Sequence, residues 1–162
     1  VAIAKEMHLR PMNVIQPQYN MADRYIEDEI VAICRKNGIG IVPFSPLAQG
    51  LLTGKYRKGQ PLPLGSRATH QADRQINALL TDENLGKVEK LSAIAADLGV
   101  PLSVLALAWI LRLPEISSVI TGASRPEQID ANVAASGLTI PDGVLKEIDA
   151  ILDYKPFVRK IG

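Results

Sequence analysis

The order of elements along the sequence predicts an α/β fold with a parallel sheet. Residues 13–16, 39–44 and 116–120 contain the apolar, β-branched residues of short strands. Helical patterns separate these strands, and strands that alternate with helices pair in parallel. An open doubly wound sheet needs more strands and a glycine-rich turn after the first one, and no G-x-G-x-x-G occurs here. The pattern therefore favours the last three strand–helix units of a closed (β/α)8 barrel, that is, a partial TIM barrel.

The first strand–helix unit has clear boundaries. Residues 1–8 already have helical periodicity, so we expect the chain to begin inside a helix, as a fragment would. The strand at residues 13–16 ends in the polar side chain of Gln16. Gly38 supplies the stop of the next helix. Four residues of that helix, at helical spacing, are expected to face the core: Ile26, Ile30, Ile33 and Cys34.

The second strand leads into a short loop and then into a long connection. Residues 45–50 form the loop, and residues 51–56 followed by 57–75 form a long connection rich in Gly, Pro, Lys and Arg. Connections of this length in compact domains are usually lids or binding loops. Thr81 is expected to cap the helix that follows, and Gly99 is expected to end it.

The third strand, residues 116–120, is expected to be covered on both faces. After it, Gly122 allows a sharp turn, and Ser124 and Glu127 have the spacing of a capping box. Pro126 fits the first turn of the helix that begins there. The free amides and positive dipole end of such a helix bind phosphate. The alternative is an ordinary strand–helix connection, in which the caps satisfy only the helix's own amides.

The composition is that of one soluble globular domain spanning residues 1–162. The formal net charge is +1 and the charges are scattered, which argues against a nucleic-acid partner. The apolar run at residues 102–113 is shorter than the roughly 20 residues that cross a bilayer, so no membrane insertion is expected. The single cysteine, Cys34, indicates a buried thiol in a reducing compartment, and the cytoplasm is the expected location. One cysteine and two distant histidines predict no metal site.

Several motifs resemble one known family. Residues 14–20 (VIQPQYN), 43–56 (PFSPLAQGLLTGKY), 108–114 (AWILRLP) and 118–132 are similar, in order and spacing, to the C-terminal half of the aldo-keto reductases. Within that family they look closest to the branch that includes the potassium-channel β-subunits. The resemblance implies a (β/α)8 barrel that binds NADP(H) without a Rossmann domain. It also implies hydride transfer between the nicotinamide and an aldehyde or ketone.

The resemblance assigns cofactor-binding residues to the ends of the first two strands. Gln16 matches the side chain that holds the nicotinamide carboxamide, and Phe44 matches the ring that packs against the nicotinamide. Lys55 and Arg67 match cations over the phosphates, including the 2′-phosphate that distinguishes NADP from NAD. The loop that wraps the pyrophosphate corresponds to Ser45, Pro46, Leu47, Ala48 and Gly50. Simpler interpretations are a loop-facing polar group for Gln16, barrel core for Phe44, and solvated surface charge for the two cations.

At the third strand the resemblance assigns the adenosine end of the cofactor. Gly122 and Ser124 match residues beside the adenosine phosphate. Gln128 and Asn132, one helical turn apart on one face, match contacts to ribose and adenine. Ala131 departs from the family pattern, because close relatives have an acidic residue there. One adenine contact of the family is therefore in doubt.

The catalytic Asp, Tyr, Lys and His of the family lie on earlier strands, so the resemblance implies no catalytic residue in this chain. We expect no carbonyl reduction by the chain alone. The expected substrate of the parent protein is a small carbonyl compound. The sequence is compatible with a homo-oligomer and does not decide the oligomeric state. Two alternatives remain: an NADP(H)-binding regulatory or redox-sensing module like a channel β-subunit, and a different (β/α)8 enzyme with a phosphate site at its last strands.

Overall fold

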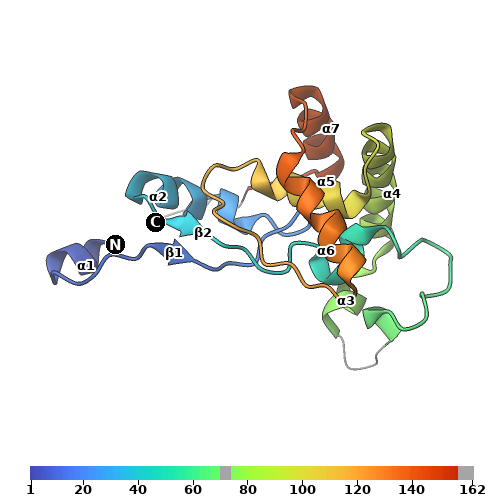
Figure 1. The fold of residues 1–162 in the computed structure, drawn as a ribbon, viewed down its shortest axis with the longest axis horizontal. Helices are drawn as coiled ribbons and strands as arrows, with labels where there is room; N and C mark the ends of the chain where they lie inside the picture. The colour runs from blue at the N-terminus through green and yellow to red at the C-terminus, as the bar shows by residue number, and fades with distance from the viewer. Residues whose placement is uncertain (70–73, 157–162) are drawn as a thin grey trace.

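The computed structural model describes residues 1–69 and 74–156, so the predicted connection and C-terminal tail lie partly outside the described residues. Helices dominate this part of the chain, with two short strands (Figure 1). The strands are β1 (Val14–Ile15) and β2 (Gly40–Ile41). The α-helices are α1 (Ala2–Glu6), α2 (Ile30–Asn37), α3 (Arg74–Leu79), α4 (Asp82–Asp97), α5 (Leu102–Leu111), α6 (Pro126–Val133) and α7 (Asp142–Leu152). The 3-10 segments are η1 (Tyr25–Glu27), η2 (Ala48–Thr53), η3 (Arg67–Thr69) and η4 (Ala134–Gly137).

The three predicted strand segments pair in parallel and in chain order. β1 pairs with β2, with Val14 opposite Gly40, and a parallel bridge joins Ile41 to Ile116. The pairing continues toward the carboxyl ends, because Ile120 N donates to Pro43 O at 3.0 Å. A parallel arrangement brings the carboxyl ends of all three segments to one edge. The predicted parallel α/β pairing is therefore confirmed for these segments.

The third segment is not buried on both faces as the sequence predicts. Ile116 is buried, but Ser117 and Ser118 are exposed and Ile120 is 41% exposed. The segment lies at the edge of the sheet, and no described strand pairs with its far side. Among the described residues its strand neighbour is β2, where Gly40 makes a close approach. A Cβ at Gly40 would lie 2.5 Å from Ser117 Oγ.

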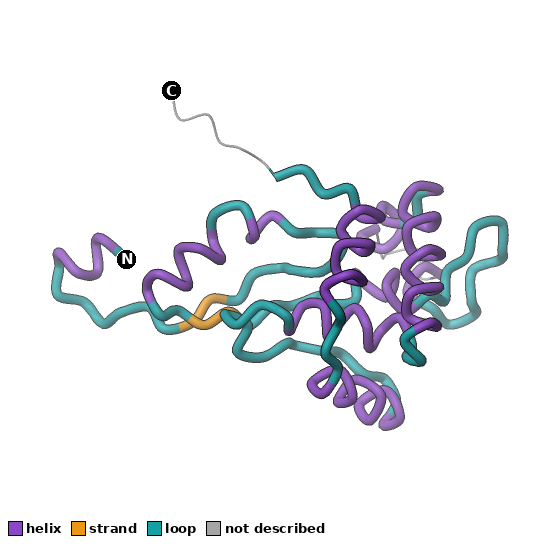
Figure 2. Tube along the Cα trace, turned by 90° about the horizontal axis from the view of Figure 1, so that it is seen from above, coloured by secondary structure: helices purple, strands orange, loops and turns teal. Residues whose placement is uncertain are grey.

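The core is centred on α5. Eight of its residues are buried, including Trp109, and it packs against α4, α6, η2 and η4. Figures 1 and 2 show α3 to α7 gathered at one end of the molecule, with α1, α2 and the strands at the other. No single helix in the described residues is long and apolar enough to cross a membrane. Together α4 and α5 have the length and composition for a span, but they are bent by 89° relative to each other.

Helix boundaries follow local signals. Thr81 Oγ1 accepts a hydrogen bond from Asn84 N at 3.1 Å, which confirms the predicted cap of α4. Gly38 (φ 64°) and Gly99 (φ 70°) have the left-handed conformation that ends a helix.

The predicted inward face of the second helix is partly wrong. Cys34 is buried as expected, but Ile33 is 48% exposed. The single helix expected to contain Ile26 and Ile33 is divided into η1 and α2, so these two residues do not share one regular helical face.

Candidate functional site

The carboxyl ends of β1 and β2 bring together the two residues predicted to contact a nicotinamide. Phe44 N donates to Pro17 O at 3.0 Å, directly after Gln16 in the chain. Gln16 is exposed, and the Phe44 side chain is 41% exposed. Phe44 is therefore not a core residue in this structure, and its ring is accessible at the same sheet edge as Gln16.

The 45–50 loop, which follows Phe44, has an unusual backbone. Ser45 (φ 55°), Ala48 (φ 47°), Gln49 (φ 57°) and Gly50 (φ 99°) all have the left-handed conformation. Each non-glycine residue in that region costs about 1 kcal/mol, and such residues cluster where a ligand or a turn requires them. Pro46 is buried and Leu47 half-buried, so the loop is anchored on its apolar side.

The backbone amides of the 45–50 loop differ in whether they are paired within the described residues. The backbone N–H groups of Ser45 and Leu47 have no hydrogen-bond partner among the described residues, whereas Ala48 N donates to Ser45 O at 3.1 Å. Backbone amides in left-handed turns form concave sites that bind anions. The small residues predicted to wrap a pyrophosphate thus lie in a backbone suited to that ligand.

A chain of side-chain hydrogen bonds links this loop to a predicted phosphate-binding cation. Arg67 Nη1 donates to Gln49 Oε1, and Gln49 Nε2 donates to Ser45 Oγ at 3.0 Å. The sequence analysis did not assign Gln49. Gln49 is the one long polar side chain in the 45–50 loop, and this is the signal that could have indicated it.

Lys55, the second predicted cation, is exposed beside the same loop. Its ammonium lies 5.1 Å from the centre of the Tyr56 ring. A Cβ at Gly50 would lie 3.2 Å from Lys55 Cε and Nζ, so glycine leaves room for this side chain. Both cations are therefore next to the 45–50 loop, Arg67 through Gln49 and Lys55 through Gly50.

Ser66, which the sequence analysis also missed, is a buried residue beside Arg67. Its hydroxyl has no hydrogen-bond partner among the described residues. A buried hydroxyl without a partner is costly unless a ligand or a water satisfies it. Nothing in the sequence separates Ser66 from an ordinary loop serine.

The predicted adenosine site is built differently from the expected capping box. The N-cap of α6 is Arg125, with Pro126 in its first turn as predicted, and Glu127 makes no capping bond. Gln128 Oε1 instead accepts hydrogen bonds from Ser124 N at 2.8 Å and from Ser124 Oγ at 3.3 Å. The capping-box prediction is wrong, because the helix begins one residue later than it assumes.

Gly122 and Asn132 lie on either side of this cap. Gly122 is exposed, has no left-handed φ, and a Cβ there would meet nothing within 4 Å. The sharp turn predicted at Gly122 is therefore absent. Asn132 is half-buried, one turn beyond Gln128. In the described part of the chain, no hydrogen bond or ion pair joins residues 122–132 to the 45–50 loop.

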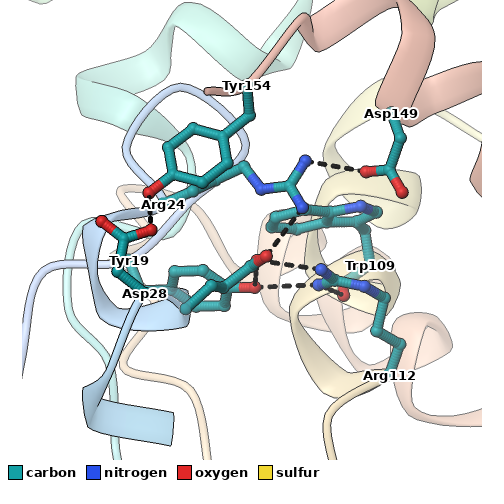
Figure 3. Close-up of polar contacts among 8 residues, drawn as sticks. Tyr19, Arg24, Asp28, Trp109, Arg112, Asp149 and Tyr154 are labelled. Atoms are coloured by element: carbon teal, nitrogen blue, oxygen red, sulfur yellow. Dashed lines mark hydrogen bonds and ion pairs between the residues drawn. The ribbon is translucent and has the colours of Figure 1, made fainter. Parts of the chain in front are cut away.

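A second polar cluster centres on Glu27 of η1 and the guanidinium groups of Arg24 and Arg112, and no motif predicted it (Figure 3). Glu27 accepts hydrogen bonds from Tyr19 Oη, from Arg112 Nη2 at 2.9 Å and from Arg24 Nη2 at 2.7 Å. The Trp109 ring lies between the two guanidinium groups in Figure 3, with Cζ of Arg112 3.6 Å and Cζ of Arg24 5.1 Å from its centre. The cluster joins η1 to α5.

Burial and charge oppose each other in this cluster. Burial raises the pKa of Glu27, but hydrogen bonds from Arg24, Tyr19 and Arg112 outweigh it, so the pKa lies below its ordinary value. Burial likewise disfavours the charge of Arg24, yet its bonds to Glu27 and Asp149 raise its pKa. Burial is the main cause of the raised pKa of Tyr19. Glu27 and Arg24 therefore remain charged at neutral pH.

A family model described as "Aldo/keto reductase family" matches residues 1–153. The chain belongs to the aldo/keto reductase family. The parallel strand segments in chain order and the predominance of helix agree with part of such a fold.

This aldo/keto reductase chain is similar to proteins with different printed names. It is 40% identical over 160 residues to a probable voltage-gated potassium channel subunit beta of Oryza sativa, covering 96% of this chain and 48% of that protein. It is 37% identical over 145 residues to an L-glyceraldehyde 3-phosphate reductase of Escherichia coli K12, covering 86% of this chain and 41% of the relative. It is 37% identical over 131 residues to an NADH-specific methylglyoxal reductase of the same strain, covering 81% and 39%.

The aldo/keto reductase chain thus spans less than half the length of these curated relatives. Members of the family use nicotinamide cofactors, and the residues present fit such a group. Unpaired amides at Ser45 and Leu47 and the exposed cations Lys55 and Arg67 are donors of the kind that a dinucleotide phosphate needs.

Proposed function

We propose that this chain supplies the dinucleotide-binding part of an NADP(H)-dependent reductase of aldehydes or ketones, built as the last three strand–helix units of a (β/α)8 barrel. The observation that carries the proposal is the left-handed 45–50 loop, which is hydrogen-bonded to Arg67 and lies at the carboxyl end of β2. Phosphate sites formed by the loops after the last strands are common in this barrel. The resemblance places the proton donor on earlier strands, so we assign no catalytic residue to this chain.

Each group of residues has a separate role in the proposal. The Gln16 amide bonds the nicotinamide carboxamide, and the exposed Phe44 ring packs against the nicotinamide face. The 45–50 loop, Lys55 and Arg67 neutralise the phosphates. Gly122, Ser124, Gln128 and Asn132 contact the adenosine end. The bound nicotinamide supplies or accepts the hydride of the reaction.

We assign NADP(H) rather than NAD(H) because the family resemblance matches Lys55 and Arg67 to cations over the phosphates, including the 2′-phosphate, and both side chains are exposed. A 2′-phosphate adds about −2 charge near neutral pH, which exposed Arg and Lys side chains favour. One relative is named as NADH-specific, so the preference is a property to be measured for each family member. We also propose a cytoplasmic location, because the sole thiol, Cys34, is buried and unpaired.

The printed names of two relatives favour a second possible function, that of a regulatory subunit. Proteins called potassium channel subunits beta from Oryza sativa and Arabidopsis thaliana are 40% and 43% identical to this chain. The alternative is an NADP(H)-binding regulatory module whose bound cofactor reports redox state to a partner protein. Turnover of small aldehydes by the full-length protein with NADPH supports the reductase, and tight NADPH binding without turnover supports the module.

Fluorescence titration of the purified protein with NADPH and NADH tests the shared part of both proposals. We expect NADPH to bind, and Phe44→Ala to weaken NADPH and NADH by similar factors, since both carry the nicotinamide. Ser124→Ala is expected to weaken binding at the adenosine end. Ile33→Ala is the matched control, because Ile33 is a similarly exposed apolar side chain on α2. Absence of binding to either dinucleotide would refute the proposed function.

A further inference from the structure

We propose that Asn20 is a positioning residue that holds the 45–50 loop in its ligand-binding conformation. The proposal rests on the proposed dinucleotide function and extends it to a residue outside the loop. Asn20 is 1% exposed, so its side chain is not itself available to a ligand.

Asn20 contacts the loop at its first residue. Asn20 Nδ2 donates a hydrogen bond to the carbonyl oxygen of Ser45 at 2.9 Å. The same carbonyl accepts Ala48 N at 3.1 Å, so both of its lone pairs are used. One of these bonds lies within the loop, and the other ties the loop to the segment after β1.

Asn20 is itself held rigidly. Its Oδ1 accepts a hydrogen bond from Ala22 N at 2.9 Å. Its backbone exchanges two hydrogen bonds with Asp23, of 3.1 and 3.0 Å. The side-chain amide therefore has a fixed direction, and it presents its N–H group to Ser45 without a further loss of side-chain entropy.

The loop needs such support because of its backbone conformation. Ser45, Ala48 and Gln49 have positive φ, which costs energy at each residue and persists only where surrounding contacts enforce it. Ser45 starts this series, and its hydroxyl accepts Gln49 Nε2, which connects to Arg67. If Ser45 leaves the left-handed region, the amides of the loop and the position of Gln49 change together. Through its bond to the Ser45 carbonyl, Asn20 thus stabilises the conformation of the loop and the position of the Arg67 side chain.

Two substitutions separate the contacts of Asn20. Asn20→Ala removes both side-chain bonds, whereas Asn20→Asp keeps an acceptor for Ala22 N but cannot donate to Ser45 O. We expect each variant to weaken NADPH binding about tenfold, the size of effect expected when a buried acceptor loses its partner. We also expect faster hydrogen exchange of the amides in residues 45–50. The control is Asn84→Ala, which removes an Asn Nδ2 bond of 2.9 Å to the carbonyl of Leu79.

A double substitution tests the proposed cause. Glycine adopts positive φ without a steric penalty, so Asn20→Ala should weaken NADPH binding less in a Ser45→Gly background than in the wild type. Asn84→Ala should leave NADPH affinity within about twofold of the wild type even where it lowers stability.

The outcomes distinguish this inference from the function it rests on. Wild-type protein that binds neither NADPH nor NADH refutes the proposed function and the inference with it. Wild-type binding combined with unchanged affinity and unchanged exchange in Asn20→Ala and Asn20→Asp overturns the inference alone. Equal losses of affinity in Asn20→Ala and Asn84→Ala also overturn it, because they indicate a general loss of stability.

Discussion

Arg24 Nη1 donates a hydrogen bond of 2.7 Å to Asp149 Oδ1, which joins the start of η1 to α7 across 125 residues of sequence. The other amino group of the same guanidinium bonds Glu27 at 2.7 Å. Trp109 lies beneath it on the central helix α5. The segment η1 and the last helix, α7, are thus connected through one side chain, which is 9% exposed.

Replacing Arg24 should therefore be strongly destabilising. Arg24→Met leaves the half-buried Glu27 with fewer partners, and we expect the free energy of unfolding to fall by about 3 kcal/mol. Urea unfolding measures this change. Lys58→Met is the control, since Lys58 pairs with Asp82 at 2.8 Å on an exposed surface and should cost less than about 1 kcal/mol. Equal effects of the two substitutions would show that the Arg24 cluster does not stabilise the fold.

The Glu27 carboxylate gives the fold a specific acid sensitivity. Its folded-state pKa lies below its ordinary value of 4.5, so its stabilising effect is complete above that pH and is lost as the pH falls through the folded-state value. Wild-type stability should decline on acidification below about pH 4.5, and Glu27→Gln should reduce this decline while lowering stability at pH 7. Unfolding curves between pH 3 and 7 provide the measurement, and identical pH slopes for the two proteins would contradict this assignment.

Two glycine substitutions should have opposite effects on stability. Gly50→Ala places a Cβ at φ 99°, 3.2 Å from Lys55 Cε, so we expect a loss of about 1 kcal/mol and weaker NADPH binding. Gly86→Ala, within α4 and with open space around its Cβ position, should stabilise the protein by about 0.5–1 kcal/mol. Thermal unfolding compares the two variants. Stabilisation by Gly50→Ala would rule out the left-handed loop as a requirement.

The observed cap of α6 predicts that Gln128, and not Glu127, contributes to stability at the start of this helix. Gln128→Ala removes the acceptor for Ser124 N and Oγ and should lower stability by about 0.5–1 kcal/mol. Glu127→Ala removes no capping bond and should have a smaller effect. A larger effect of Glu127→Ala in urea unfolding would restore the capping box that the sequence suggested.

Local signals in the sequence predicted local structure well. Thr81, Gly38 and Gly99 were placed correctly because each one acts on backbone groups within a few residues. The capping-box prediction was wrong for a related reason. Glu127 and Gln128 are neighbours that can each accept a hydrogen bond from a backbone N–H, so a shift of the helix start by one residue exchanges their roles.

Long-range relationships could not be predicted in the same way. The bond between Arg24 and Asp149 depends on how helices pack, and no periodicity encodes it. Burial of the third strand was overestimated, because β-branched composition does not show which strands lie beside it. The left-handed conformations of Ser45 and Gln49 were also missed, since neither residue type demands a positive φ.

The most direct test of the proposed function is the ratio of NADH to NADPH dissociation constants in the wild type and in Arg67→Ala. We predict that the wild type prefers NADPH and that Arg67→Ala weakens NADPH binding about tenfold while changing NADH binding less than about threefold, because the proposed function assigns the guanidinium to the 2′-phosphate. Arg57→Ala, which removes another exposed arginine of the same connection, should leave the ratio unchanged. Equal affinity for the two dinucleotides, or an unchanged ratio in Arg67→Ala, would contradict the assignment of the 45–50 loop and Arg67 as an NADP(H) site.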